Sequence, residues 1–176
     1  MSEFEAFPKM ARLSRHVVIT EKIDGTNAQV FIADDGAMKF GSRTRWITPE
    51  DDNFGFAAWA HDNREELLKL GPGRHFGEWW GKDIQRNYGL LERRFSLFNS
   101  DRWDIERPTC CHVVPVLHEG MFDMSAIEII LSSLSVHGSR AAPDFINPEG
   151  IVVFHSAANI SFKKTLKKDE LPKSMA

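Results

Sequence analysis

Residues 21–27 read EKIDGTN and place a lysine beside an aspartate and a glycine, between the apolar runs VVIT and AQVFI. An Asp-Gly pair between two such runs is a strong signal for a hairpin turn, and a turn needs no chemistry. It accounts for Asp24 and Gly25, but not for the amine of Lys22 beside them. A lysine amine becomes a nucleophile where neighbouring cations or a desolvated pocket favour its neutral form. The stretch is therefore either a surface turn or a turn that presents a nucleophile.

Three further stretches carry charged residues next to apolar runs: HFGEWWG at 75–81, EGIVV at 149–153 and SFKKT at 161–165. Together with EKIDGTN, and in this order, they resemble the motifs of the covalent nucleotidyltransferase superfamily. That superfamily contains the ATP-dependent RNA and DNA ligases and the mRNA capping enzymes. A Lys-x-Asp-Gly match alone is weak evidence. Four motifs in order, spread over most of the chain, make the resemblance specific.

The end of the lysine motif favours one branch of this superfamily. In DNA ligases and capping enzymes the motif usually continues to an arginine, whereas KIDGTN ends in Asn27, as in the RNA ligases. The longer stretch GEWWGKDIQRNYGL resembles phage and bacterial proteins of the RNA ligase type. The resemblance implies an ATP-dependent RNA ligase that uses Mg²⁺ or Mn²⁺ and serves RNA repair. A capping-type guanylyltransferase, a DNA-ligase-like adenylyltransferase and a catalytically silent nucleic-acid-binding module remain alternatives.

The resemblance also implies a role for each matching residue. Lys22 attacks ATP and forms a lysine–AMP phosphoramidate, AMP passes to a 5′-phosphate, and a 3′-hydroxyl displaces it. Such transfers depend on positioning and on neutralising charge. Catalytic roles are implied for Lys22, Asp24, Glu78, Glu149 and Lys163, with Glu149 also a metal ligand. Nucleotide contacts are implied for Glu21, Asn27, Arg43, Phe98 and Lys164, with Phe98 stacking on the base.

The chain departs from the family pattern in three places. Thr165 stands where many relatives carry a second lysine of the last motif, and Asn99 stands where an aspartate is common. The chain also ends soon after that motif, so no C-terminal accessory domain is expected. A partner protein would then supply the missing domain that binds RNA or nicked nucleic-acid ends. Along the acceptor path the sequence predicts three arginines, Arg86, Arg93 and Arg94.

Short strands and two helices must position these residues. Alternating apolar runs predict strands at 16–20, 28–33, 37–43, 74–81, 95–100, 112–117, 150–155 and 160–164. One helix is predicted over 54–70, capped by Thr48 or Asp51, and another over 124–138, capped by Ser125 and ended by Gly138. This order predicts an α+β fold. The resemblance makes it a nucleotidyltransferase (ATP-grasp-like) domain of antiparallel sheets with a few flanking helices, one domain over residues 1–176.

Composition excludes several other classes of protein. With 42% hydrophobic and 27% charged residues the chain is typical of globular proteins, and no apolar run is long enough to span a bilayer. The N-terminus lacks a secretory signal, so a cytoplasmic location is expected. A formal net charge of −3 argues against coating nucleic acid by bulk electrostatics, but it permits a local basic groove. The adjacent Cys110 and Cys111 lack CxxC partners and are read as packing residues.

Overall fold

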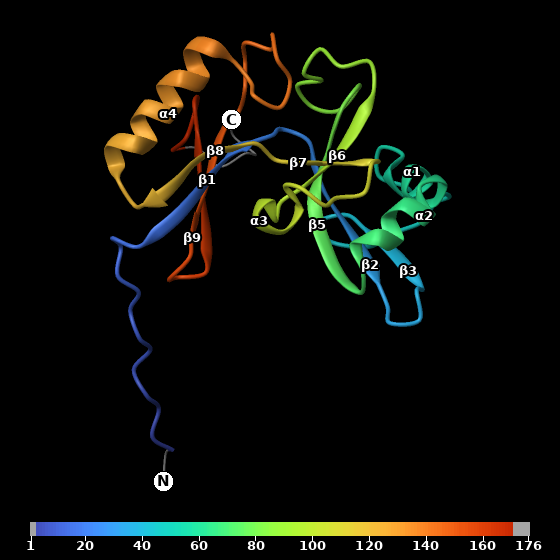
Figure 1. Cartoon of the computed structure of the whole chain (residues 1–176), viewed down its shortest axis with the longest axis horizontal. Helices are drawn as coiled ribbons and strands as arrows, with labels where there is room; N and C mark the ends of the chain where they lie inside the picture. Colours follow the sequence, from blue (N-terminus) through green and yellow to red (C-terminus); the bar gives the residue numbers. More distant parts are fainter. Residues whose placement is uncertain (1–2, 171–176) are drawn as a thin grey trace.

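The chain crosses twice between two β-sheets, as a computed structural model of residues 3–170 shows (Figure 1). Sheet A has the spatial order β10-β9-β1-β8. Its strands are β1 (His16–Lys22), β8 (Val116–Met121), β9 (Gly150–His155) and β10 (Ile160–Thr165). Sheet B has the order β4-β3-β2-β5-β6-β7. Its strands are β2 (Thr26–Ile32), β3 (Met38–Gly41), β4 (Trp46–Ile47), β5 (Gly73–Gly81), β6 (Arg93–Leu97) and β7 (Cys111–Val113). Neighbouring strands are antiparallel except β6 and β7, so the expected α+β arrangement is confirmed.

The helix predicted over 54–70 is broken into three short segments. They are α1 (Phe56–Asp62), α2 (Arg64–Leu67) and the 3₁₀ turn η1 (Leu68–Leu70). The predicted caps are wrong, because the carboxylate that accepts hydrogen bonds from the N–H groups of Ala57 and Ala58 belongs to Asp52. Side-chain oxygens at this position satisfy N–H groups that have no partner within the helix.

The second predicted helix is α4 (Met124–His137), and it ends at Gly138, whose φ of 80° suits a glycine. Its cap is Asp123 rather than Ser125, since the Asp123 carboxylate accepts a hydrogen bond from the Ser125 N–H. The short helix α3 (Ser100–Trp103) was not predicted. Asn99 caps it by accepting a hydrogen bond from the Arg102 N–H, which gives Asn99 a structural role.

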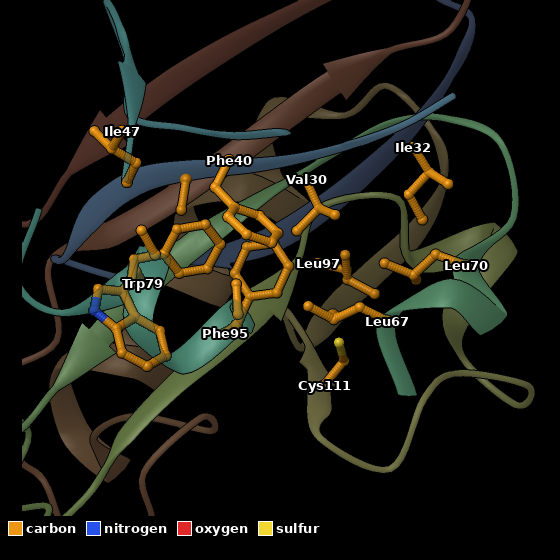
Figure 2. Close-up of a cluster of buried hydrophobic side chains, with 14 of the residues drawn as sticks. Val30, Ile32, Phe40, Ile47, Leu67, Leu70, Trp79, Phe95, Leu97 and Cys111 are labelled. Atoms are coloured by element: carbon orange, nitrogen blue, oxygen red, sulfur yellow. The ribbon is translucent and has the colours of Figure 1, made fainter. Parts of the chain in front are cut away.

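Each sheet buries one face under helices. In sheet B, alternate side chains of β2, β5 and β6 pack with α1 and α2 into one apolar cluster, drawn in Figure 2. It includes Val30, Phe40, Trp79, Phe95 and Leu97. In sheet A, β1 and β9 pack against α4 through Val17, Ile19, Ile151, Val153, Ile127 and Leu134. Burial of each large apolar side chain stabilises the fold by about 1.5–3 kcal/mol.

One expected hairpin turn and one expected strand are replaced by crossings between the sheets. Asp24-Gly25 forms no hairpin, because β1 belongs to sheet A and β2 to sheet B. The strand predicted at 112–117 is likewise divided at Pro115, with β7 in sheet B and β8 in sheet A. Proline cannot donate a ladder hydrogen bond. Its carbonyl accepts one from the Glu21 N–H at 3.0 Å, so the two crossings lie side by side.

Among the helices of residues 3–170, none has the length and apolar character needed to cross a membrane. Cys111 lies in the buried cluster of sheet B and Cys110 packs against it, as expected for packing residues.

Candidate functional site

The amine of Lys22 is held by the carboxylate of Glu149. Lys22 is the last residue of β1, and its partner across the strand pair is Gly150, the first residue of β9. This register brings Lys22 Nζ to 2.6 Å from Glu149 Oε2. The two side chains are 21% and 10% exposed. The structure therefore unites two residues that are separated by most of the sequence, and it leaves the amine partly accessible.

The register of β10 with β9 decides whether Lys163 or Lys164 lies on the same face of sheet A as Lys22. Lys163 lies opposite Val152, which is two residues from the partner of Lys22. Side chains of opposed residues share a face and successive ones alternate, so Lys163 lies on the Lys22 face. Lys164 lies on the opposite face and its Nζ bonds Asp169 at 3.2 Å. The geometry supports a place in the site for Lys163 and separates Lys164 from it.

The crossing after Lys22 is held by backbone hydrogen bonds to side chains of β5 and the loop that follows it. The Gly25 N–H donates to Glu78 Oε1 at 3.0 Å, and the Asp24 N–H donates to the Tyr88 hydroxyl at 2.8 Å. A Cβ on Gly25 would lie 2.4 Å from the Trp79 carbonyl oxygen. Glycine is required here by close approach of two backbones, because a real Cβ atom does not come so near.

Arg86 connects the Lys22 segment to the Glu149 segment. Its Nε donates to Asp24 Oδ2 at 2.9 Å, and its Nη1 donates to the Asn147 and Pro148 carbonyls at 3.0 and 3.4 Å. Arg86 therefore has a structural role in this site, and its predicted place on an acceptor path stays a prediction. Arg93 is engaged similarly, by the carbonyls of Lys82 and Phe54.

Glu21 faces away from Lys22. Its carboxylate accepts hydrogen bonds from the Ser139 hydroxyl at 2.6 Å and from the N–H groups of Arg140 and Ala141 at 2.7 and 2.9 Å. Burial raises the pKa of Glu21, and these hydrogen bonds offset part of that rise. A nucleotide contact by this carboxylate would require the three hydrogen bonds to break. In this structure Glu21 anchors the 139–141 turn against β1.

A hollow of about 430 Å³ lies on the face of sheet B that the helices leave uncovered. The predicted Asn27, Arg43 and Phe98 line it, together with Ala28, Gln29, Ser42 and Phe76. Asn27 Nδ2 donates to Glu78 Oε2 at 3.1 Å, which ties the hollow to the crossing. The Phe98 side chain is 42% exposed, so one ring face is available for stacking on a planar base.

The structure thus brings the candidate residues into two groups, Lys22, Glu149 and Lys163 on sheet A and Asn27, Arg43, Glu78 and Phe98 on sheet B. Asp24 and Gly25 join them. Sequence reasoning missed the clamp made by Arg86 and Tyr88. One feature of the sequence could have pointed to these contacts: Tyr88 is the chain's single tyrosine and lies in a polar stretch that also contains Arg86.

A divalent ion would have to rely on few protein ligands. In the described part of the chain, no three His, Cys, Asp or Glu side chains gather so that they could hold a metal. Mg²⁺ usually binds one or two carboxylates plus phosphate oxygens of the substrate. Glu149 next to a bound triphosphate fits that donor set.

Comparisons with known proteins agree with this fold. A family model described as RNA ligase matches residues 15–168. Among curated proteins none matches the chain. Solved structures of Naegleria gruberi RNA ligase variants match it at low identity, and this chain spans about half their length. Two variants with ATP and manganese give TM-scores of 0.65, at 22% and 24% identity, covering 86% and 88% of this chain and 50% and 51% of theirs. A variant with AMP and manganese gives 0.64 at 22% identity, covering 86% and 49%.

Proposed function

The chain belongs to the RNA ligase family, and on that premise we propose that it is an ATP-dependent RNA ligase that acts through a covalent lysine–AMP intermediate at Lys22. One observation carries the proposal: Lys22 Nζ lies 2.6 Å from Glu149 Oε2, on the face of sheet A that also carries Lys163. An amine paired with a carboxylate, with a second cation on the same face of the sheet, suits phosphoryl chemistry, which depends on positioning and on neutralising charge. The ATP, AMP and manganese in the similar Naegleria gruberi structures support the choice of nucleotide and ion.

In the first step Lys22 Nζ attacks the α-phosphorus of ATP. A nitrogen–phosphorus bond forms, and the bond from that phosphorus to the bridging oxygen breaks, so that pyrophosphate leaves. Glu149 Oε2 already accepts a hydrogen bond from Nζ and is placed to receive the amine proton. Its other oxygen, Oε1, is the ligand that it would offer to Mg²⁺ or Mn²⁺, whose charge would neutralise the phosphates. Lys163 contributes a cation on the same face.

The hollow of sheet B receives the nucleoside. The half-exposed ring of Phe98 stacks on adenine, and Asn27 and Arg43 line the same hollow and contact the ribose or phosphate. Glu78 holds the crossing through the Gly25 N–H, so it keeps Lys22 in register with the hollow. In the later steps AMP passes from Lys22 to a 5′-phosphate of RNA, and a 3′-hydroxyl attacks that phosphate and releases AMP.

The test is transfer of label to the protein. Purified chain is incubated with Mg²⁺ or Mn²⁺ and with ATP, or separately GTP, carrying a radioactive α-phosphate, and is then resolved under denaturing conditions. Lys22→Arg keeps the charge but lacks the reactive amine, and Lys69→Ala is a control because Lys69 pairs with Glu66 on the helical side. The proposal expects label from ATP in wild type and Lys69→Ala but not in Lys22→Arg. Label from GTP alone would favour a capping-type guanylyltransferase instead.

A further inference from the structure

We propose that the uncovered face of sheet B, from the edge of the nucleotide hollow outward, is a binding track for single-stranded RNA. The track consists of Phe31, Lys39, Trp46, Arg74 and Phe76. The choice of RNA rests on the proposed function, in which nucleic-acid ends are the acceptors. The track itself rests on strand register, exposure and charge.

Strand register places the track residues on one face. Phe31 of β2 lies between Lys39 of β3 and Arg74 of β5. One step along, Gln29 lies opposite Phe76, and Trp46 of β4 pairs with Gly41, which is the other partner of Gln29. The alternate residues of β2 belong to the buried cluster under the helices. The track therefore runs across four strands on the helix-free face.

This face opens progressively away from Lys22. Along β5, the alternate side chains Trp80, Glu78 and Phe76 are 1%, 8% and 51% exposed. Trp80 is covered by Tyr88 at the junction with sheet A. Glu78 holds the crossing, and Phe76 shares the hollow with Phe98. A strand of RNA that follows this face outward would begin beside the reactive lysine and leave towards solvent.

Aromatic rings and cations alternate along the track. The Arg74 guanidinium carbon lies 5.0 Å from the Phe31 ring centroid and 5.4 Å from that of Trp46. Lys39 Nζ lies 5.9 Å from the Trp46 ring centroid on the same face. Trp46 remains 44% exposed. Exposed aromatic faces beside cations are the pattern by which proteins bind single strands, since bases stack on the rings and phosphates meet the cations.

The charge of this face differs from that of the whole chain. Among the alternate positions of the described strands β2 to β6 on this face, Glu78 is the one carboxylate, and it is buried and hydrogen-bonded. The net charge of the chain is −3, so the basic track is a local feature. The β2–β3 turn, with Asp34 and Asp35, marks its outer end. The part of this face that can attract phosphate groups therefore extends from the hollow as far as that turn, where the aspartates begin.

Unpaired bases are needed because stacking on Trp46 or Phe76 requires an accessible base face, which a duplex hides. The test is fluorescence anisotropy with a 5′-phosphorylated, 3′-fluorescein-labelled RNA oligonucleotide, alone or annealed to its complement. Trp46→Ala is expected to weaken binding of the single strand about five- to tenfold, whereas Trp46→Phe keeps a stacking ring and stays close to wild type. Arg74→Gln is expected to reduce the slope of log affinity against log salt concentration by about one, which corresponds to the loss of one phosphate contact.

Matched controls are Phe7→Ala and Lys69→Ala, an exposed aromatic residue and an exposed cation away from the track. Unchanged affinity in Trp46→Ala and Arg74→Gln, or a preference for duplex that neither substitution alters, would overturn the track. Labelling of Lys22 by ATP separates the two proposals, because track variants are expected to label as wild type does. Affinity that depends on Trp46 in a chain that never labels would support the track and remove the ligase function.

Discussion

Arg86 donates a hydrogen bond from Nε to Oδ2 of Asp24 across 2.9 Å, and this contact joins the loop after β5 to the crossing that follows Lys22. The same guanidinium bonds the two carbonyls that precede Glu149. Arg86 thus reinforces, beside the β1–β9 register, the placement of the nucleophile relative to its carboxylate partner. The relative positions of Lys22 and Glu149 depend on a residue outside all four sequence motifs.

Arg86→Ala should therefore lower both stability and labelling. Loss of the ion pair and the carbonyl bonds is expected to cost about 2 kcal/mol of unfolding free energy, measured by urea denaturation. Arg45→Ala is the control, because the Arg45–Asp51 pair is exposed at 44% and 76% and should cost less than about 1 kcal/mol. Equal stability losses in the two variants would show that Arg86 is no clamp.

Gly25→Ala should disrupt the crossing. The added Cβ would meet the Trp79 carbonyl oxygen at 2.4 Å and Trp80 Cβ at 2.7 Å, so the backbones must separate. We expect a loss of about 2 kcal/mol or more together with loss of Lys22 labelling. Gly89→Ala, where a Cβ meets nothing within 4 Å but φ is +67°, should cost about 1 kcal/mol and label normally. A Gly25→Ala chain with wild-type stability would contradict the close approach.

Lys163→Ala and Lys164→Ala form a matched pair, since the two residues are adjacent but lie on opposite faces of β10. Loss of one charged contact to the triphosphate should slow labelling of Lys22 about tenfold in Lys163→Ala and raise the KM for ATP. Lys164→Ala removes an exposed pair with Asp169 and should change the rate less than about twofold. The reverse order in a rate measurement against ATP concentration would mean that the β10 register is shifted.

Glu21 should make stability depend on pH. Burial raises the pKa of Glu21 above the ordinary value of 4.5. Between pH 4.5 and the pKa of the folded chain, the folded chain therefore binds this proton more tightly than the unfolded chain does. Stability from this group therefore falls as pH rises from about 4.5 through the folded pKa. Glu21→Gln should remove that fall, because a glutamine oxygen can still accept from the N–H groups of Arg140 and Ala141 while its amide donates to the Ser139 oxygen.

The measurement is the free energy of unfolding of wild type and Glu21→Gln across this pH range. Other titrations cancel in the difference between the two chains. A difference that stays constant with pH would contradict the raised pKa. Glu21→Ala is a second variant, expected to be less stable than Glu21→Gln at every pH, because it leaves the 139–141 turn without its acceptor.

Much of the fold follows from local pattern. Alternation predicted most strands, and Gly138 correctly ended α4, because apolar periodicity and glycine conformation act within a few residues. The errors arose where tertiary contacts override local signals. Asp24-Gly25 has the residue types of a hairpin turn, but the hydrogen bond to Glu78 and the close approach to Trp79 hold Gly25 in a crossing that leads to sheet B. Pro115 interrupts an apolar run that reads as one strand.

The candidate site was predictable in part for the same reason. The motifs named Lys22, Glu78 and Glu149, and the structure joins Lys22 to Glu149 and Glu78 to the crossing that follows Lys22. They placed both Lys163 and Lys164 in the site, whereas the register of β10 with β9 puts the two side chains on opposite faces. The Arg86 contacts join three segments that are far apart in the sequence, and the residue types around Arg86 do not say which segments these are.

A covalent adenylyl group on Lys22 is best detected by the mass of the intact protein after incubation with ATP and Mg²⁺ or Mn²⁺, followed by mapping of the modified peptide. Wild type is expected to gain the mass of one adenylyl group, the group is expected to map to Lys22, and Lys22→Arg is expected to gain nothing. A folded wild-type chain that gains no mass, or an adenylyl group on another lysine, would contradict the proposed intermediate at Lys22.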